Sequence, residues 1–437
     1  MNICVLGLWH LGTVTSACLS SVGHKVIGLD FDTNLINDLN NGEAPIFEPG
    51  LNNLLKSGIH KKYFLFTCKI DEALKDCDIL WVAYDTPVDE NDCADFQYVI
   101  RQVQLVFPFL KKGCTILVSS QMPVGSTKDL ELLAKHNFPN QDFGFAYSPE
   151  NLRLGNALEV FLNPDRIVIG FRSNKDQIKI KELLKPITDN LIWMSVESAE
   201  MTKHAINSFL ATSVTFANEI ATICEIVGAD AKEVEKGLKT EARIGPKAYL
   251  SPGSAFSGGT LARDISFLSQ IANNKDLTVP LIKSISESNS EHKNWVKKRL
   301  LKKIENLSKR NIAVWGLTYK AGTNTLRRSL SVELCNWLLE QGAFLHVHDP
   351  AVDKLPSEWS KNVTRYNNPE ESILHVDAIV VATEWPEYTE ISYDAFSNLK
   401  SSILMVDANR FLKQFSGVDG IEYAAVGEPH EKIQIKL

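Results

Sequence analysis

Short apolar runs that end in Gly-, Pro- or Asp-containing turns recur along the chain and are followed by segments of helical periodicity. Such runs occupy residues 2–8, 24–29, 78–83, 115–119 and 143–146, and again 311–315, 344–348, 377–382 and 403–406. This alternation is typical of parallel strands in an α/β sheet. A long apolar helical pattern from about residue 197 to 227 separates the two series, and a more polar helix is predicted over 287–307. The pattern predicts two Rossmann-like doubly wound sheets joined by a long central helix.

We expect three domains, at residues 1–195, 196–308 and 309–437. The chain has 437 residues, 44% of them hydrophobic and 23% charged, values that are ordinary for a soluble globular protein. A formal net charge of -7 disfavours a general nucleic-acid binder. We find no apolar run of membrane-spanning length and expect no membrane partner. A strand at the very N-terminus also speaks against a signal peptide.

The 8 cysteines form no C-x-x-C pair and show no metal-ligand spacing. We therefore expect no metal and no disulfide. Free cysteines in strand and helix patterns fit a reducing, cytoplasmic compartment.

The first strand leads into the turn G-L-W-H-L-G, which begins at Gly7 and ends at Leu11 and Gly12, with Trp9 at the middle glycine position of G-x-G-x-x-G. A helix follows, and the second strand ends in Asp30, near the distance of the acid that binds an adenosine ribose. The helix N-terminus near Gly12 can offer N–H groups to a pyrophosphate, with Trp9 beside it. The unit predicts a dinucleotide site, and an ordinary βαβ unit without a ligand is the alternative.

Residues 242–269 have a Gly/Ser/Ala-rich centre, with a Pro-Gly pair before it and Arg263-Asp264 after it. Small residues let the backbone come close to a ligand, and the Arg-Asp pair lies where a helix should begin. A flexible linker between two domains is the alternative explanation of this composition.

This window resembles the active-site loop of the nucleotide-sugar 6-dehydrogenases, the UDP-glucose and GDP-mannose dehydrogenase family, which reads roughly G-x-G-F-G-G-S-C-F-x-K-D. In this alignment Phe256 and Gly258 match, Arg263 takes the Lys position and Asp264 matches the final Asp. Thr260 stands where the family has its catalytic Cys.

The resemblance extends over nearly the whole chain. The segment E-M-T-K-H-A-I-N is similar to the family's E-M-x-K-Y-x-x-N, and its Lys203 and Asn207 are four residues apart, on one helix face. The segment S-P-E-N-L-R-L-G, with Glu150, Leu152 and Arg153, resembles N-P-E-F-L-R-E-G. P-I-F-E-P-G-L at residues 45–51 resembles P-I-x-E-P-G-L but by itself indicates only a turn. Further motif positions are Thr86 in D-T-P, Gln121 in place of a Thr in S-T-V-P-V-G-T, Arg243 in A-R-I-G, Lys320 in G-L-x-x-K, and Arg327 in a T-D-D-x-R-x-S motif whose two acids are replaced by Asn324 and Thr325.

The resemblance implies NAD-dependent oxidation of the C6 hydroxyl of a nucleotide sugar, most simply UDP-glucose, to a carboxylate through two hydride transfers. It assigns the first oxidation to Lys203 and Asp264 acting through a water, with Asn207 holding the sugar. It assigns the second oxidation to a Cys thiolate, followed by hydrolysis assisted by Glu150. By the same resemblance, Gly7, Trp9, Leu11, Gly12, Asp30, Thr86, Gln121, Arg263 and Arg327 contact the cofactor, and Leu152, Arg153, Arg243, Phe256, Gly258 and Lys320 contact the substrate.

Thr260 is a poor substitute for the catalytic Cys as a nucleophile. An aliphatic hydroxyl needs a strong adjacent base to lose its proton, whereas a thiol titrates at about pH 8.5. We therefore expect a divergent member that kept both nucleotide-binding folds and altered the second oxidation, so that its product is the uronate or only the aldehyde. A catalytically silent NAD- and UDP-sugar-binding partner is one alternative, and an ordinary UDP-glucose 6-dehydrogenase is another. The resemblance also implies a homodimer, in which Arg243 reaches into the neighbouring subunit's sugar site.

Overall fold

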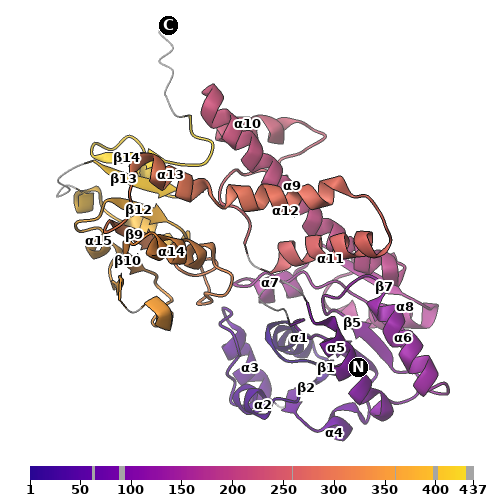
Figure 1. Cartoon of the computed structure of the whole chain (residues 1–437). Coiled ribbons are helices and arrows are strands. Elements are labelled where there is room, and N and C mark those ends of the chain that lie inside the picture. The colour runs from indigo at the N-terminus through magenta and orange to yellow at the C-terminus, as the bar shows by residue number, and fades with distance from the viewer. Residues whose placement is uncertain (62–63, 88–93, 258, 360, 397–401, 430–437) are drawn as a thin grey trace. The chain divides into compact units, whose positions relative to one another are not determined.

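The computed structural model describes residues 1–61, 64–87, 94–257, 259–359, 361–396 and 402–429. They form two compact units, Met1–Ile206 and Asn207–Leu437. The long helix α9 (Val196–Val227) begins in the first unit and continues into the second (Figure 1).

The first unit is built on an eight-stranded sheet of order β3-β2-β1-β4-β5-β6-β7-β8, in which only the β6–β7 pair is antiparallel. The strands are β1 (Asn2–Leu6), β2 (Lys25–Leu29), β3 (Phe64–Thr67), β4 (Ile79–Val82), β5 (Thr115–Val118), β6 (Gly144–Tyr147), β7 (Ile167–Phe171) and β8 (Leu191–Met194). The first six follow the strand order of a dinucleotide-binding sheet. The carboxyl ends of β1, β4, β5 and β6 are therefore neighbours along one edge.

Helices flank this sheet, and its central strands β1, β4 and β5 are buried on both faces. The helices are α1 (His10–Ser21), α2 (Thr33–Asn40), α3 (Leu51–His60), α4 (Ile70–Leu74), α5 (Phe96–Val106), α6 (Ser126–Asn137), α7 (Ala157–Leu162) and α8 (Asn174–Leu184). Successive β1 side chains alternate between two cores, since Cys4 and Leu6 lie in one and Ile3 and Val5 in the other. This alternation explains why β1 is an unbroken apolar run.

The second unit carries a six-stranded, all-parallel sheet of order β11-β10-β9-β12-β13-β14. Its strands are β9 (Asn311–Trp315), β10 (Phe344–His348), β11 (Val363–Arg365), β12 (Ala378–Val381), β13 (Ile403–Asp407) and β14 (Ile421–Ala424). Its helices are α10 (Ala231–Thr240), α11 (Thr260–Asn274), α12 (Pro280–His292), α13 (Trp295–Lys303), α14 (Leu330–Glu340) and α15 (Pro369–Ser372). The predicted fold of two Rossmann-like sheets and a long central helix is confirmed.

The prediction of one helix over 287–307 is wrong, because α12 ends at His292 and α13 begins at Trp295. Trp295 is buried and its indole N–H donates to Glu225 Oε1 on α9 at 2.8 Å. The His292 ring bonds the Gly253 carbonyl at 2.8 Å. These two contacts with other segments coincide with the break in the helix.

By length and composition α9 could cross a membrane, contrary to the expectation that no apolar run is long enough. It is the one such helix in the described parts of the chain, and less than half of its most apolar window is buried. The core helices of soluble proteins have the same composition, and α9 also buries the polar side chains of Lys203, His204 and Asn207.

Candidate active site

The turn between β1 and α1 has the backbone shape that a dinucleotide site requires. Gly7 has φ +90°, a conformation that favours glycine. A Cβ on Gly12 would lie 1.7 Å from the Gly7 carbonyl oxygen, so only glycine lets α1 pack this closely on the turn. Trp9, in the middle glycine position, is 47% exposed and precedes the first turn of α1. The turn therefore keeps its two essential glycines.

Two carboxylates bind the backbone of this turn. Asp30 Oδ2 accepts from the Leu8 N–H at 2.8 Å, and Asp85 Oδ2 accepts from the Leu11 N–H at 3.2 Å. Asp30 remains half-exposed at the end of β2, where a ribose diol would lie. Asp85 was missed in the sequence, although it belongs to the D-T-P motif, because only its contact with a segment 74 residues away marks it.

Thr86 and Gln121 meet at the carboxyl ends of β4 and β5. The Thr86 hydroxyl donates to the Gln121 carbonyl at 2.6 Å, and both residues are buried. This bond therefore joins the two motif segments at the carboxyl ends of β4 and β5, on the same side of the sheet as the nucleotide-binding turn after β1.

Lys203 and Glu150 are brought together from positions 53 residues apart. The Lys203 ammonium donates to the Glu150 carbonyl and lies 3.6 Å from Glu150 Oε2. Lys203 is buried, and Glu150 Oε1 is a buried atom with no hydrogen-bond partner among the described residues. An ammonium has three N–H donors, so Lys203 keeps a donor beyond those directed at Glu150. The Lys203 ammonium is thus held out of bulk water beside the Glu150 carboxylate.

One turn further along α9, Asn207 binds Asp264. The Asn207 side-chain amide donates to the Asp264 carboxylate, and Asp264 is completely buried on α11. Lys203 and Asn207 occupy adjacent turns of one helix, as their spacing predicted.

Thr260 is the first residue of α11, and it is exposed. It shares the first turn of this helix with Arg263 and lies one turn before Asp264. Gly259 precedes it, and the Arg328 guanidinium is so close that a Cβ on Gly259 would be 2.1 Å from it. Thr260 thus lies at a helix N-terminus, directly after a glycine that the Arg328 guanidinium approaches closely.

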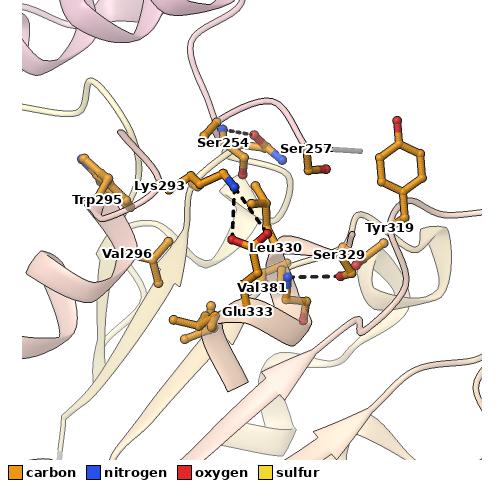
Figure 2. Close-up of a pocket in the computed structure, with 18 of the residues that line it drawn as sticks. Ser254, Ser257, Lys293, Trp295, Val296, Tyr319, Ser329, Leu330, Glu333 and Val381 are labelled. Carbon is orange, nitrogen blue, oxygen red and sulfur yellow. Dashed lines mark hydrogen bonds and ion pairs between the residues drawn. The ribbon is translucent and has the colours of Figure 1, made fainter. Parts of the chain in front are cut away.

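The second unit contains a cavity of about 450 Å³ where β9 and β12 end and α14 begins (Figure 2). Lys320 lines it, as do Ser254 and Ser257 from the loop before α11. Figure 2 shows Lys293 pointing toward Glu333, whose carboxylate oxygens lie 3.1 and 3.3 Å from the ammonium. No signal in the sequence marked this ion pair.

Two titratable side chains of this cavity are shifted toward neutrality. Burial raises the pKa of Glu384, and the Asp407 carboxylate raises it further against the opposing effect of Lys232. Burial lowers the pKa of His292, although its bond to the Gly253 carbonyl opposes this. Burial thus disfavours the charged forms of both side chains.

The remaining predicted substrate contacts have different environments. Leu152 packs against the first unit's core, and Arg153 is exposed in the same segment. The Phe256 N–H donates to Asn289 Oδ1 at 2.9 Å.

Arg243 is 88% exposed and pairs with Glu241 at 2.8 Å. Arg327 is exposed before α14, and Gly258 lies outside the described residues.

Comparison with known proteins identifies the class. Models of the UDP-glucose/GDP-mannose dehydrogenase family match residues 1–188 (NAD binding domain), 197–291 (central domain) and 313–414 (UDP binding domain). The chain belongs to this family and is an NAD-dependent nucleotide-sugar dehydrogenase. The predicted family, enzyme class and NAD cofactor are confirmed.

The chain is similar along its length to several members. It is 32% identical to the UDP-glucose 6-dehydrogenase TuaD of Bacillus subtilis over 98% of this chain and 93% of that protein. It is also 32% identical to the UDP-glucose 6-dehydrogenase of Rickettsia bellii, over 94% and 96% of the two chains. The structure of a UDP-glucose dehydrogenase from Pyrobaculum islandicum superposes with a TM-score of 0.87 at 27% identity, covering 97% of each chain. A UDP-D-ManNAc dehydrogenase from Pyrococcus horikoshii, at 23% identity and a TM-score of 0.86, shares the fold.

Proposed function

We propose that the protein oxidises the C6 hydroxyl of a UDP-sugar, UDP-glucose or a close analogue, and that its second oxidation is slow or absent. The observation that carries the second part is Thr260, an exposed threonine at the start of α11 where the resemblance places a nucleophilic thiol. The nucleotide part is supported by the match of residues 313–414 to a UDP binding domain and by the names of the relatives.

The first unit has the residues to hold NAD, which accepts a hydride when bound. The turn from Gly7 to Gly12 would take the pyrophosphate, and Asp30 would accept from the adenosine ribose. Trp9, Leu11, Thr86 and Gln121 would contact the cofactor from the same edge of the sheet. The resemblance to the family leads us to propose Arg263 and Arg327 as further cofactor contacts.

In the first oxidation the O6 proton leaves to a base while the C6 hydrogen leaves as a hydride and a C=O bond forms. We assign the base to Asp264 acting through a water, with Asn207 orienting its carboxylate and holding the sugar. We assign stabilisation of the developing O6 charge to Lys203, because its ammonium is buried and retains a donor.

The family's second oxidation starts with attack of a thiolate on the aldehyde, and Thr260 has no comparable ionised form near neutral pH. The aldehyde hydrate can lose hydride without a covalent adduct, which would give a slow second turnover. We assign Glu150, which has one carboxylate oxygen lacking a partner in the described residues, to activating the water that hydrates the aldehyde.

We further propose a homodimer formed along α9. Phe209, Phe216 and Ile223 are 71%, 47% and 56% exposed and recur every seven residues, so they form one apolar stripe on the helix. Covering this stripe with a second copy removes it from water, and the exposed Arg243 would then be available to the neighbouring sugar site. Sedimentation should give a dimer, and Phe216→Asp should weaken it. A monomeric unmodified protein would remove this proposal.

A substrate panel tests the proposed activity. NADH formation should be fastest with UDP-glucose-like sugars, slower with GDP-mannose, and absent with free glucose, because the second unit binds the nucleotide. Binding of NAD and UDP without NADH from any nucleotide sugar would favour the silent-partner alternative.

A further inference from the structure

The segment P-I-F-E-P-G-L contains a buried carboxylate, Glu48, that has no part in the proposed chemistry. Its Oε1 accepts from the Ala157 N–H at 2.8 Å, and its Oε2 accepts from the Gly155 N–H at 2.9 Å. Oε2 also lies 2.9 Å from His10 Nε2. Since a carboxylate only accepts hydrogen bonds, His10 Nε2 carries the proton in this contact. Glu48 is 4% exposed, so these three donors replace its hydration.

These contacts tie together three segments that are distant in sequence. His10 is the first residue of α1 and lies within the nucleotide-binding turn, directly after Trp9. Gly155 and Ala157 end the segment that carries Glu150, and Gly155 has φ +87°. Because α1 also packs against α3 and α7, Glu48 sits among the helices that flank its own loop. One carboxylate therefore connects the cofactor turn to the segment that holds Glu150.

We propose that Glu48 is a positioning residue, which with His10 holds the Glu150 segment against the nucleotide-binding turn and couples that segment to NAD binding. In Glu48→Gln the side-chain amide has one oxygen and one NH₂ group in place of two carboxylate oxygens. At least one N–H of Gly155 or Ala157 therefore loses its acceptor. The Glu150 segment then loosens while the strands beneath it stay intact. By linkage, whatever orders the turn also orders the segment in the intact protein, and this link is lost in the variant.

Amide hydrogen exchange of the full chain tests the coupling without turnover. In the unmodified protein, NAD should slow exchange at Gly155 and Ala157. In Glu48→Gln, these amides should exchange about tenfold faster and respond little to NAD, since a bond to a charged acceptor is lost. The matched control is Asp176→Asn, which alters another buried carboxylate. Asp176 binds Thr115 at 3.1 Å, at the amino end of β5, opposite the cofactor edge. The Asp176→Asn variant should leave the effect of NAD on hydrogen exchange at Gly155 unchanged.

Steady-state kinetics give the second readout, and this readout rests on the proposed function. Glu48→Gln should lower kcat about tenfold or more, because the loosened segment carries the Glu150 carbonyl that holds Lys203, the group assigned to the first oxidation. The KM for NAD should change less than about threefold, because the turn itself is intact. His10→Gln keeps an N–H near the Nε2 position and should retain most activity, whereas His10→Ala should fall toward Glu48→Gln. Should Glu48→Gln not fold, the His10 pair still decides the question.

Two results would overturn the proposal: a loosened segment 150–157 with unchanged kcat, or NAD protection of Gly155 that survives in Glu48→Gln. Equal loss in His10→Gln and His10→Ala would also overturn the role of His10. If the unmodified protein forms no NADH, the proposed function fails, yet the exchange experiment still tests the coupling.

Discussion

Removal of the Lys203 ammonium should destabilise the first unit mainly through the carboxylate that it leaves behind. Lys203 lies 3.6 Å from Glu150 Oε2, which corresponds to an attraction of about 4–5 kcal/mol at an effective dielectric of about 20. Dehydration of both groups offsets much of this attraction. Lys203→Met leaves the carboxylate unpaired at a half-buried site and also removes the bond to the Glu150 carbonyl. We expect a cost of about 2–3 kcal/mol in the free energy of unfolding.

A double-mutant cycle separates the two contributions. In a Glu150→Gln background only the carbonyl bond is lost, so Lys203→Met should cost only about 1 kcal/mol there. Urea unfolding near neutral pH, followed by a probe in the first unit, measures all four proteins. Lys179 is the control, because its ammonium also donates to a backbone carbonyl, that of Gly113 at 2.6 Å, and this bond does not involve Glu150. Lys179→Met should therefore be additive with Glu150→Gln. Equal costs of Lys203→Met in both backgrounds would refute the charge-based reasoning.

Three further predictions follow from single side chains. Asp30→Ala should erode a strong preference for NAD over NADP, because the Asp30 carboxylate repels a ribose 2'-phosphate; binding titrations check this, and better NADP affinity in the unmodified protein would contradict it. Thr260→Cys should speed the second oxidation, though to less than family rates because catalytic groups act as a unit; rapid-quench mass spectrometry should then detect a covalent intermediate, and no gain in rate would count against the assignment. Burial raises the pKa of Glu235, but hydrogen bonds from Lys239, Ser251 and Lys232 outweigh burial and hold this pKa at about 2, below the ordinary 4.5. Because the folded pKa is depressed, the stabilisation by Glu235 is complete above pH 4.5 and is lost as the pH falls toward 2, so Glu235→Gln should flatten acid unfolding in that window.

The fold could be predicted because the central strands of both sheets are apolar runs whose burial on both faces leaves little choice of structure. The strands β3, β7, β8, β11 and β14 were not predicted, and β8 and β11 contain no fully buried residue. The helix α9 could be predicted because its apolar residues persist over many turns. The break between His292 and Trp295 could not, since the local sequence there favours a continuous helix. The contacts at the break are made by Glu225 and Gly253, which are distant in the chain.

The candidate site was predictable as motifs but not as contacts. Spacing on one helix placed Lys203 and Asn207 on adjacent turns, and α9 has that geometry. That Lys203 meets Glu150, or that Glu48 binds His10, depends on how separate loops meet at a sheet edge, which residue types alone do not encode. The second oxidation rests on the chemistry of a single side chain, Thr260, and so needs a direct measurement.

That measurement is the number of NADH formed per UDP-glucose at completion, with the mass of the sugar product determined in parallel. The matched comparison is Thr260→Cys under the same conditions. We predict about one NADH per sugar and a C6 aldehyde, or a distinctly slow second NADH without a covalent intermediate, from the unmodified protein. Two NADH per sugar, formed together at equal rates with the uronate as the product, would contradict the account.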